Sequence, residues 1–233
     1  MELTLIQKIA VFAIPVIFAI TLHEAAHGFI AMKFGDRTAW MLGRVTANPL
    51  KHIDPIGTIG VPLVLLLLSK LAGGPAFLFG WAKPVPVNFN NLRRPKRDML
   101  WVAAAGPGAN LLMALFWGLM IQLGHVLGGD MGLPLMLMGA AGIFINAMLA
   151  ALNLLPIPPL DGGRIAVSLL PSGPSNMLAR VEPYGIFILL ALMFTGVLGT
   201  LMWPLIGLVF SLSVLLTGVS GETLLSLINI LLG

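Results

Sequence analysis

The chain has 233 residues, of which 58% are hydrophobic and only 9% are charged, and its mean hydropathy is +0.99. A soluble domain carries roughly 25% charged residues, so this composition excludes an ordinary soluble protein and indicates a polytopic protein of the lipid bilayer. The chain has no cysteine, which excludes disulfides and thiolate metal sites, so any metal ligand must be His, Asp or Glu.

The first apolar run, Ile9 to Met32, is long enough to span a membrane and contains the ionisable sequence His23-Glu24-Ala25-Ala26-His27. A charged side chain at the centre of a membrane helix costs roughly 2.5 to 3.5 kcal/mol, so such residues usually have a function. The run is too long for a signal peptide and lacks a small-residue cleavage site. We therefore predict a retained span that carries a functional site.

The spacing within this sequence predicts the kind of site. Residues four apart on a helix share a face, so His23 and His27 can bind one ion, and zinc suits two imidazole nitrogens. Glu24 lies one position around the helix, where a carboxylate can act as a general base toward water at the metal. The pattern is typical of hydrolytic zinc sites.

A shorter apolar run, Gly57 to Ser69, has the length of a re-entrant segment. If Gly57 to Trp81 enters the membrane and returns, most basic residues lie on one face, which the positive-inside rule makes cytoplasmic. If the segment crosses once, that bias disappears, so five and six spans both stay open. The residues that share the face in the favoured, re-entrant topology are Lys33, Arg37, Arg44, Lys51, Lys83, Arg93, Arg94, Lys96, Arg97, Arg164 and Arg180, which is 11 of the 13.

The formal charge of +4 comes mainly from one basic group, Arg93 to Arg97. This group follows an apolar segment and is not interleaved with aromatic residues. We therefore interpret it as a loop that orients the protein in the membrane, and we expect no binding to nucleic acid.

Three further apolar regions follow. Met99 to Leu127 and Leu133 to Leu155 each have the length of one span. Tyr184 to Leu216 is too long for a single span, and Gly199 with Pro204 suggests two crossings that turn there. The predicted fold class is thus an all-α polytopic membrane protein with five to six transmembrane helices and irregular or re-entrant loops.

Asp161 is the favoured third metal ligand. It follows the Leu133 to Leu155 span in the sequence Pro156-Ile157-Pro158-Pro159-Leu160-Asp161-Gly162-Gly163. The prolines forbid regular helix and the glycines permit close backbone approach, as expected of a loop that lines a cavity at membrane depth. We interpret the other candidates as structural: His52 and Asp54 in an interfacial turn, His125 at the membrane interface, and Glu182 at a helix start.

Three sequence motifs together resemble the site-2 protease family of intramembrane zinc metalloproteases. They are His23 to His27, the sequence Ala105-Gly106-Pro107-Gly108-Ala109-Asn110, and the stretch from Asn153 to Gly163, in that order. Gly43 to Pro49 and Lys83 to Asn88 are similar to the short prokaryotic members, which lack PDZ or CBS domains.

The resemblance implies a zinc-dependent endopeptidase that cleaves transmembrane helices of membrane-protein substrates. His23, His27 and Asp161 would bind one zinc ion per chain, and Glu24 would activate water. Asn153 would hydrogen-bond the substrate backbone or the developing oxyanion; alternatively, it caps the unwound end of its own helix. The protein would lie in the cell membrane with its active site toward the cytoplasm.

Two extended segments, Arg44 to Thr46 and Val85 to Val87, are candidates for a small β-loop near the active site. Such a loop could pair with an unwound substrate by β-augmentation, although ordinary interfacial loops are an equal alternative. Gly106 and Gly108 are predicted to allow close packing of helices in lipid.

The predicted organisation is a single membrane-embedded domain, residues 1–233. Its catalytic core spans about residues 9–165, and additional helices occupy about 177–233. No loop between spans reaches the roughly 50 residues that a regulatory domain needs. Two alternative functions are a membrane transporter of zinc or another divalent cation and a non-catalytic relative that binds membrane proteins. The sequence leaves the oligomeric state open.

Overall fold

The computed structural model describes residues 3–71 and 82–233, and all regular elements in these two stretches are helical. Within them, five segments are long and apolar enough to cross a membrane. They are α1 (Leu5–Phe34), α4 (Pro95–Leu127), α5 (Gly129–Asn153), the segment Ser172–Phe194 and α9 (Val197–Thr217). The predicted all-α polytopic fold is confirmed.

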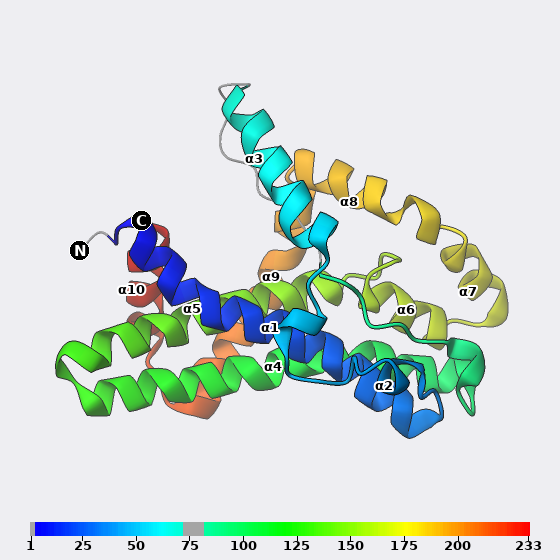
Figure 1. Cartoon of the computed structure of the whole chain (residues 1–233), viewed down its shortest axis with the longest axis horizontal. Helices are drawn as coiled ribbons and strands as arrows, with labels where there is room; N and C mark the ends of the chain where they lie inside the picture. The colour runs from blue at the N-terminus through cyan, green and yellow to red at the C-terminus, as the bar shows by residue number, and fades with distance from the viewer. Residues whose placement is uncertain (1–2, 72–81) are drawn as a thin grey trace.

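Helices α4 and α5 form an antiparallel pair along the long axis of the molecule, and α1 lies against both (Figure 1). Small residues allow this close approach. A Cβ atom added at Gly142 of α5 would lie 2.1 Å from the indole ring of Trp117 on α4, and one added at Gly132 would lie 2.5 Å from the carbonyl oxygen of Gly124. Between helices in lipid, close packing of small residues takes the place of the hydrophobic effect. Among the candidate spans of the described residues, α5 is the most buried, so it lies at the centre of the fold.

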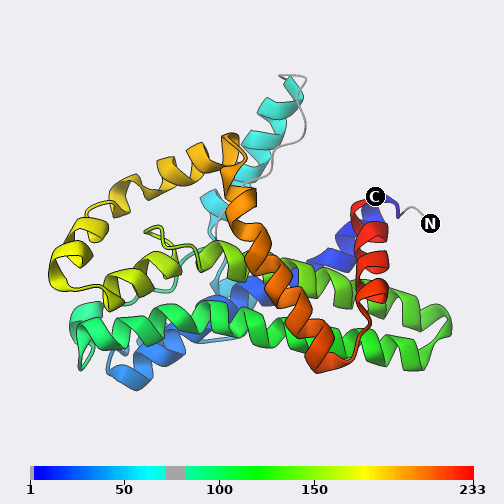
Figure 2. The same ribbon diagram turned by 180° about the vertical axis from the view of Figure 1, so that it is seen from behind.

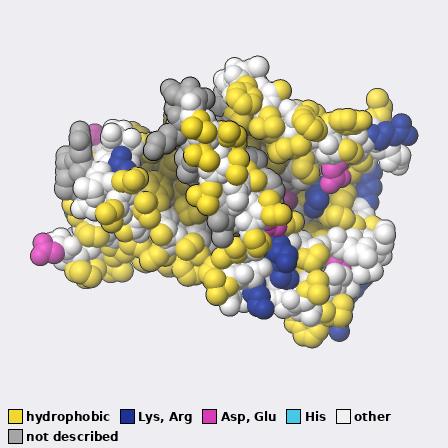
Figure 3. All heavy atoms as spheres, turned by 45° about the horizontal axis from the view of Figure 1, so that its top comes forward, with side chains coloured by type: hydrophobic (Ala, Val, Ile, Leu, Met, Phe, Trp, Pro, Cys, Tyr) yellow, Lys and Arg dark blue, Asp and Glu magenta, His cyan; other side chains and the backbone are white. Residues whose placement is uncertain are grey.

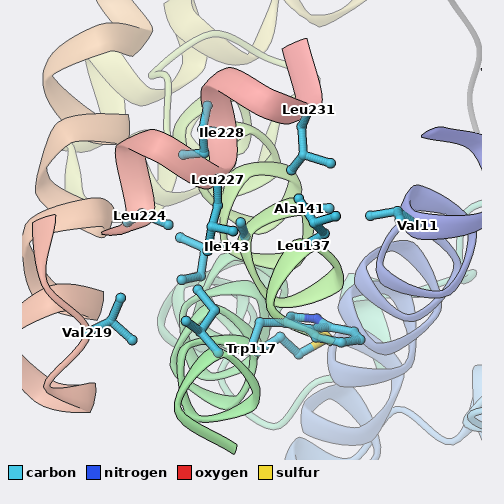
Figure 4. Close-up of a cluster of buried hydrophobic side chains, with 13 residues drawn as sticks. Val11, Trp117, Leu137, Ala141, Ile143, Val219, Leu224, Leu227, Ile228 and Leu231 are labelled. Carbon is cyan, nitrogen blue, oxygen red and sulfur yellow. The ribbon is translucent and has the colours of Figure 1, made fainter. Parts of the chain in front are cut away.

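Two apolar clusters hold the other helices to this pair. One joins α1, α4 and α5 to the last helix, α10 (Gly221–Leu232), through side chains such as Val11, Trp117, Ile143 and Leu227 (Figure 4). The other joins α5 to α9, which crosses the pair obliquely (Figure 2), and includes Ala147 and Ile206. The start of α1 and the end of α10 lie close together at one end of the molecule (Figure 1).

The C-terminal region breaks earlier than the sequence suggested. Segment Ser172–Phe194 consists of α7 (Ser172–Ala179), a short turn η4 (Glu182–Tyr184) and α8 (Gly185–Phe194). The chain then turns at Thr195 and Gly196, where Gly196 has a φ of +75°, so the predicted turn at Gly199 and Pro204 was wrong. Glycine adopts this left-handed conformation without steric cost, which ends α8, whereas Pro204 is accommodated inside α9.

The region between α1 and α4 contains short elements: α2 (Thr38–Met41), η1 (Pro49–Lys51), η2 (Pro55–Gly60), α3 (Val61–Leu71) and η3 (Phe89–Asn91). Helix α3 stands away from the body of the molecule (Figure 1). The predicted re-entrant segment begins with η2 and α3, but its return, residues 72–81, lies outside the described residues. The predicted β-loop is also not formed as such, because the described residues contain no strand.

A buried carboxylate, Asp36, fixes the loop that leads into α4. It accepts hydrogen bonds from both the backbone and the side chain of Thr38, from the backbone N–H of Asn88 at 2.7 Å and from the side chain of Asn91 at 3.1 Å. Burial raises the pKa of Asp36, but these hydrogen bonds to the ionised form outweigh it, so the net pKa lies below its usual value.

Replacing Asp36 with Asn is expected to lower the stability of the purified protein at pH 7, because Asn cannot accept hydrogen bonds at both side-chain positions. Hydrogen bonds to a charged group contribute about 1.5 to 3 kcal/mol. Since the folded-state pKa is depressed, this contribution is present above the unfolded pKa of about 4 and is lost as the pH falls below it. Thermal unfolding in detergent should show a lower Tm at pH 7 and a shrinking difference below pH 4. An equal Tm at pH 7 would contradict this role, and Asp130→Asn, at an exposed position, is the control.

Hydrophobic side chains cover much of the outer surface, as expected of helices that face lipid (Figure 3). Most Lys and Arg side chains visible in this view lie toward the end of the molecule that carries α2 and α7. Basic side chains are therefore concentrated toward one end of a largely apolar surface.

Candidate active site

The three predicted metal ligands lie together. His23 and His27 project from α1, and their Nε2 atoms are 3.1 Å apart. The Oδ2 atom of Asp161 is 3.3 Å from each of these nitrogens. Among the described residues, this is the group of at least three His, Asp or Glu side chains whose ligand atoms could hold a metal ion. The structure thus brings together two residues of α1 and one that is more than 130 positions later in the sequence.

The Pro-rich loop and its two glycines explain how Asp161 reaches α1. Asp161 is the first residue of α6 (Asp161–Leu169), where the helix dipole favours a carboxylate. A Cβ atom at Gly162 would lie 2.3 Å from the carbonyl oxygen of Leu154, and one at Gly163 would lie 2.3 Å from the backbone nitrogen of Pro158. Only glycine therefore lets the loop fold back on the first turn of α6, with Asp161 directed at the imidazoles.

The surroundings of the Asp161 carboxyl group suit a metal ligand. This carboxyl group is buried, and its Oδ2 atom faces the Nε2 atoms of His23 and His27. The buried Oδ2 atom accepts no hydrogen bond of ordinary geometry. A buried carboxylate oxygen without a hydrogen-bond donor, facing two imidazole nitrogens, has the chemistry expected of a zinc site.

Helix α4 fixes the orientation of both imidazoles through contacts with their Nδ1 atoms. The Nδ1 atom of His27 donates to the carbonyl oxygen of Val102 at 2.7 Å, and the Nδ1 atom of His23 lies 2.6 Å from Oδ1 of Asn110. Hydrogen bonds at Nδ1 leave Nε2 available to a metal. No role was predicted for Asn110, although a polar amide in the middle of an apolar span is a signal that points to one.

Gly106 has a more specific place than the general helix packing predicted for it. A Cβ atom at this position would lie 2.4 Å from Nε2 of His27 and 2.6 Å from Nε2 of His23. A Cβ atom at Gly108 would have no atom within 4 Å. Gly106 therefore leaves open the space beside the ligand nitrogens, and Gly108 does not contribute to it.

The predicted general base, Glu24, is in contact with an extended segment, residues 82–88. Its Oε2 atom accepts a hydrogen bond from the backbone N–H of Val85 at 2.7 Å. The buried side chain of Arg44 donates to the carbonyl oxygen of Lys83 at 2.7 Å. The carboxylate of Asp36 accepts a hydrogen bond from the backbone N–H of Asn88. Three charged side chains thus fix this segment next to α1.

The two segments predicted to form a β-loop lie near each other, although they form no strand. A Cβ atom at Gly28, one residue after His27, would lie 2.9 Å from the side chain of Val45 and 3.0 Å from that of Val85. His52 links the first segment to the residues just before the second: its Nε2 atom contacts the carbonyl oxygen of Thr46 at 3.0 Å. Its own carbonyl oxygen accepts from the backbone N–H of Lys83.

The remaining polar candidates have structural contacts. Asp54 caps η2 by accepting from the N–H groups of Ile56 and Gly57, and Glu182 forms an exposed ion pair with Arg164 at 3.4 Å. His125 lines an open pocket at the far end of α4. Asn153, the last residue of α5, donates to the carbonyl oxygen of Leu149 at 3.0 Å, a contact that suits its reading as a helix-end residue.

Comparisons with known proteins agree with the geometry. The model of Peptidase family M50 matches residues 130–196. The chain is 39% identical over 198 residues to "Putative zinc metalloprotease YwhC" of Bacillus subtilis, covering 83% of this chain and 84% of that protein. It is 30% identical over 202 residues to "Putative zinc metalloprotease Rip2" of Mycolicibacterium smegmatis, covering 84% of this chain and 71% of that protein. No solved structure matches significantly. The chain therefore belongs to peptidase family M50, the site-2 protease family, and is an enzyme of the membrane.

Proposed function

We propose that this protein is a zinc-dependent endopeptidase that cleaves peptide bonds within transmembrane segments of other membrane proteins. The convergence of His23, His27 and Asp161 carries the proposal. These side chains are mostly buried among membrane-spanning helices, so a substrate must reach them within the membrane.

The donor set fits one zinc ion per chain. Two imidazole nitrogens and a carboxylate oxygen are a common ligand set of catalytic zinc, which keeps a fourth position for water or substrate. Gly106 leaves the space that such an ion needs beside the two nitrogens. The names of the relatives also point to zinc. A bound zinc ion would polarise the scissile carbonyl group and make water a stronger nucleophile.

Glu24 would act as the general base and then as the general acid. It takes a proton from the attacking water as the new C–O bond forms, and it gives that proton to the leaving nitrogen as the C–N bond breaks. The hydrogen bond from Val85 fixes one oxygen of the carboxylate, Oε2, so that the other can exchange the proton. Asn153 would bind the substrate backbone or the oxyanion after releasing its contact with Leu149.

The substrate helix must unwind before attack, because its peptide bonds are protected by its own hydrogen bonds. We propose that residues 44–46 and 85–87 receive the unwound segment by β-augmentation. Pro84 and Pro86 lack N–H groups, and the N–H of Val85 already binds Glu24. The edge would therefore offer mainly carbonyl oxygens and the N–H of Val87.

The active site would lie toward the cytoplasmic side of the cell membrane. This follows from the positive-inside rule and from the basic residues near the same end of α1 as the ligands, such as Lys33 and Arg44. A zinc transporter is less compatible with the structure, because a transport pathway needs ligands along several spans and the described residues provide one such cluster.

Removal of the metal tests the proposed function. The purified protein in detergent or liposomes should cleave a single-span membrane substrate, and a zinc chelator should abolish cleavage. Added Zn²⁺ should restore it. Mass spectrometry of the products should place the cut inside the apolar span. Cleavage that persists in the zinc-free protein, or a cut found only outside the span, would contradict the proposal.

A further inference from the structure

A row of buried hydrogen bonds runs behind His23 through three helices. Asn110 of α4 and Asn146 of α5 are both fully buried. The Nδ2 atom of Asn146 donates to the carbonyl oxygen of Gly142 at 2.8 Å, and its Oδ1 atom accepts from Nδ2 of Asn110 at 2.9 Å. Nδ2 of Asn110 also donates to the carbonyl oxygen of Ala19 on α1, at 3.2 Å, and its Oδ1 atom lies 2.6 Å from Nδ1 of His23.

The direction of this row is determined at its two backbone ends. A carbonyl oxygen only accepts hydrogen bonds, so Gly142 requires the NH₂ group of Asn146 and thereby turns its Oδ1 toward Asn110. The carbonyl oxygen of Ala19 likewise requires the NH₂ group of Asn110. Both constraints leave Oδ1 of Asn110 facing His23, which must then carry its proton on Nδ1.

The position of this proton decides whether His23 can bind a metal. A neutral imidazole has a lone pair on one nitrogen only, and a metal ligand needs it on the atom that faces the ion. His27 obtains the correct tautomer from the carbonyl oxygen of Val102, which cannot exchange donor for acceptor. The amide of Asn110 could turn over, and it would then present a donor to His23 and place the lone pair on the wrong nitrogen.

We propose that Asn110 and Asn146 are positioning residues that hold the proton of His23 on Nδ1 and so keep its Nε2 lone pair directed at the metal. Asn110 acts directly on the imidazole, and Asn146 keeps the Asn110 amide in the required orientation. This inference rests on the proposed function, since it assumes that Nε2 of His23 binds zinc.

Two substitutions of Asn110 separate this role from a role in packing alone. Asn110→Leu removes the acceptor for His23, whereas Asn110→Asp keeps it and replaces the NH₂ group of the amide with a second carboxyl oxygen. The zinc affinity of each folded, full-length protein is measured by competition with a chelator, and folding is checked by thermal unfolding. Loss of such an outer partner typically weakens a metal site about 10- to 100-fold, which is the effect expected for Asn110→Leu. Asn110→Asp should remain close to the native affinity, even if its Tm falls.

Asn146→Leu should weaken zinc binding by a smaller factor than Asn110→Leu, because Ala19 still holds the Asn110 amide. If Asn110→Asp loses as much affinity as Asn110→Leu, or if neither variant changes it, the role of Asn110 is refuted. An unchanged affinity in Asn146→Leu refutes the role of Asn146. If the native protein binds no zinc, the proposed function itself fails, and that outcome is distinct from the others.

Discussion

Replacing Glu24 with Gln is expected to reduce cleavage of a membrane substrate by about 10²- to 10⁴-fold, the usual contribution of a general base, while zinc stays bound. Gln has nearly the same shape and can still accept the hydrogen bond from the N–H of Val85, so the segment 82–88 should keep its place. It cannot take up the proton of the attacking water. The loss should therefore appear in the rate of cleavage and not in the zinc content.

The measurement pairs a cleavage assay with metal analysis of the same preparation. Glu182→Gln is the matched control, because Glu182 is an exposed carboxylate whose partner is Arg164. This control should cleave at the native rate. Cleavage retained by Glu24→Gln would remove Glu24 from its proposed role, and loss of zinc in that variant would show that the carboxylate supports the metal instead.

Gly106→Ala should abolish zinc binding and, with it, cleavage. The new methyl group would lie 2.4 Å from Nε2 of His27 and 2.6 Å from Nε2 of His23, well inside van der Waals contact. The rings cannot easily move away, because hydrogen bonds to Val102 and Asn110, on the same helix as Gly106, hold their Nδ1 atoms close to α4. The substitution therefore fills the space that the ion needs.

Gly108→Ala provides a matched control on the same helix. It makes the same chemical change two residues away, where an added Cβ atom meets nothing within 4 Å. Both variants should fold, since Ala favours a helix more than Gly does. Metal analysis should then find zinc in Gly108→Ala and not in Gly106→Ala. Native zinc content in both would show that α4 does not approach the imidazoles as closely as the structure indicates.

The sequence predicted those parts of the site that depend on local spacing. His23 and His27 are one helical turn apart, so their shared face followed from helix geometry alone. Asp161 was predicted because the prolines and glycines around it are unusual beside an apolar span. Its contact with α1 nevertheless depends on tertiary packing, and the structure supplies that contact.

Other features could not be read from one sequence. The contact of Asn110 with His23 depends on the rotation of α4 relative to α1, and the hydrogen bond from Val85 to Glu24 joins residues that are 61 positions apart. The turn at Gly196 was missed because Gly199 and Pro204 are equally good helix breakers by composition. Both of those residues instead lie at exposed positions within the continuous helix α9.

The most direct test of the account is the metal environment of the purified protein. Metal analysis should find about one zinc per chain, and X-ray absorption should show two imidazole nitrogens at about 2.0 to 2.1 Å together with oxygen ligands. His23→Ala and Asp161→Ala should each remove zinc or change this shell. A native protein without zinc, or with a shell that contains no imidazole, would contradict the convergence of His23, His27 and Asp161 on a single ion.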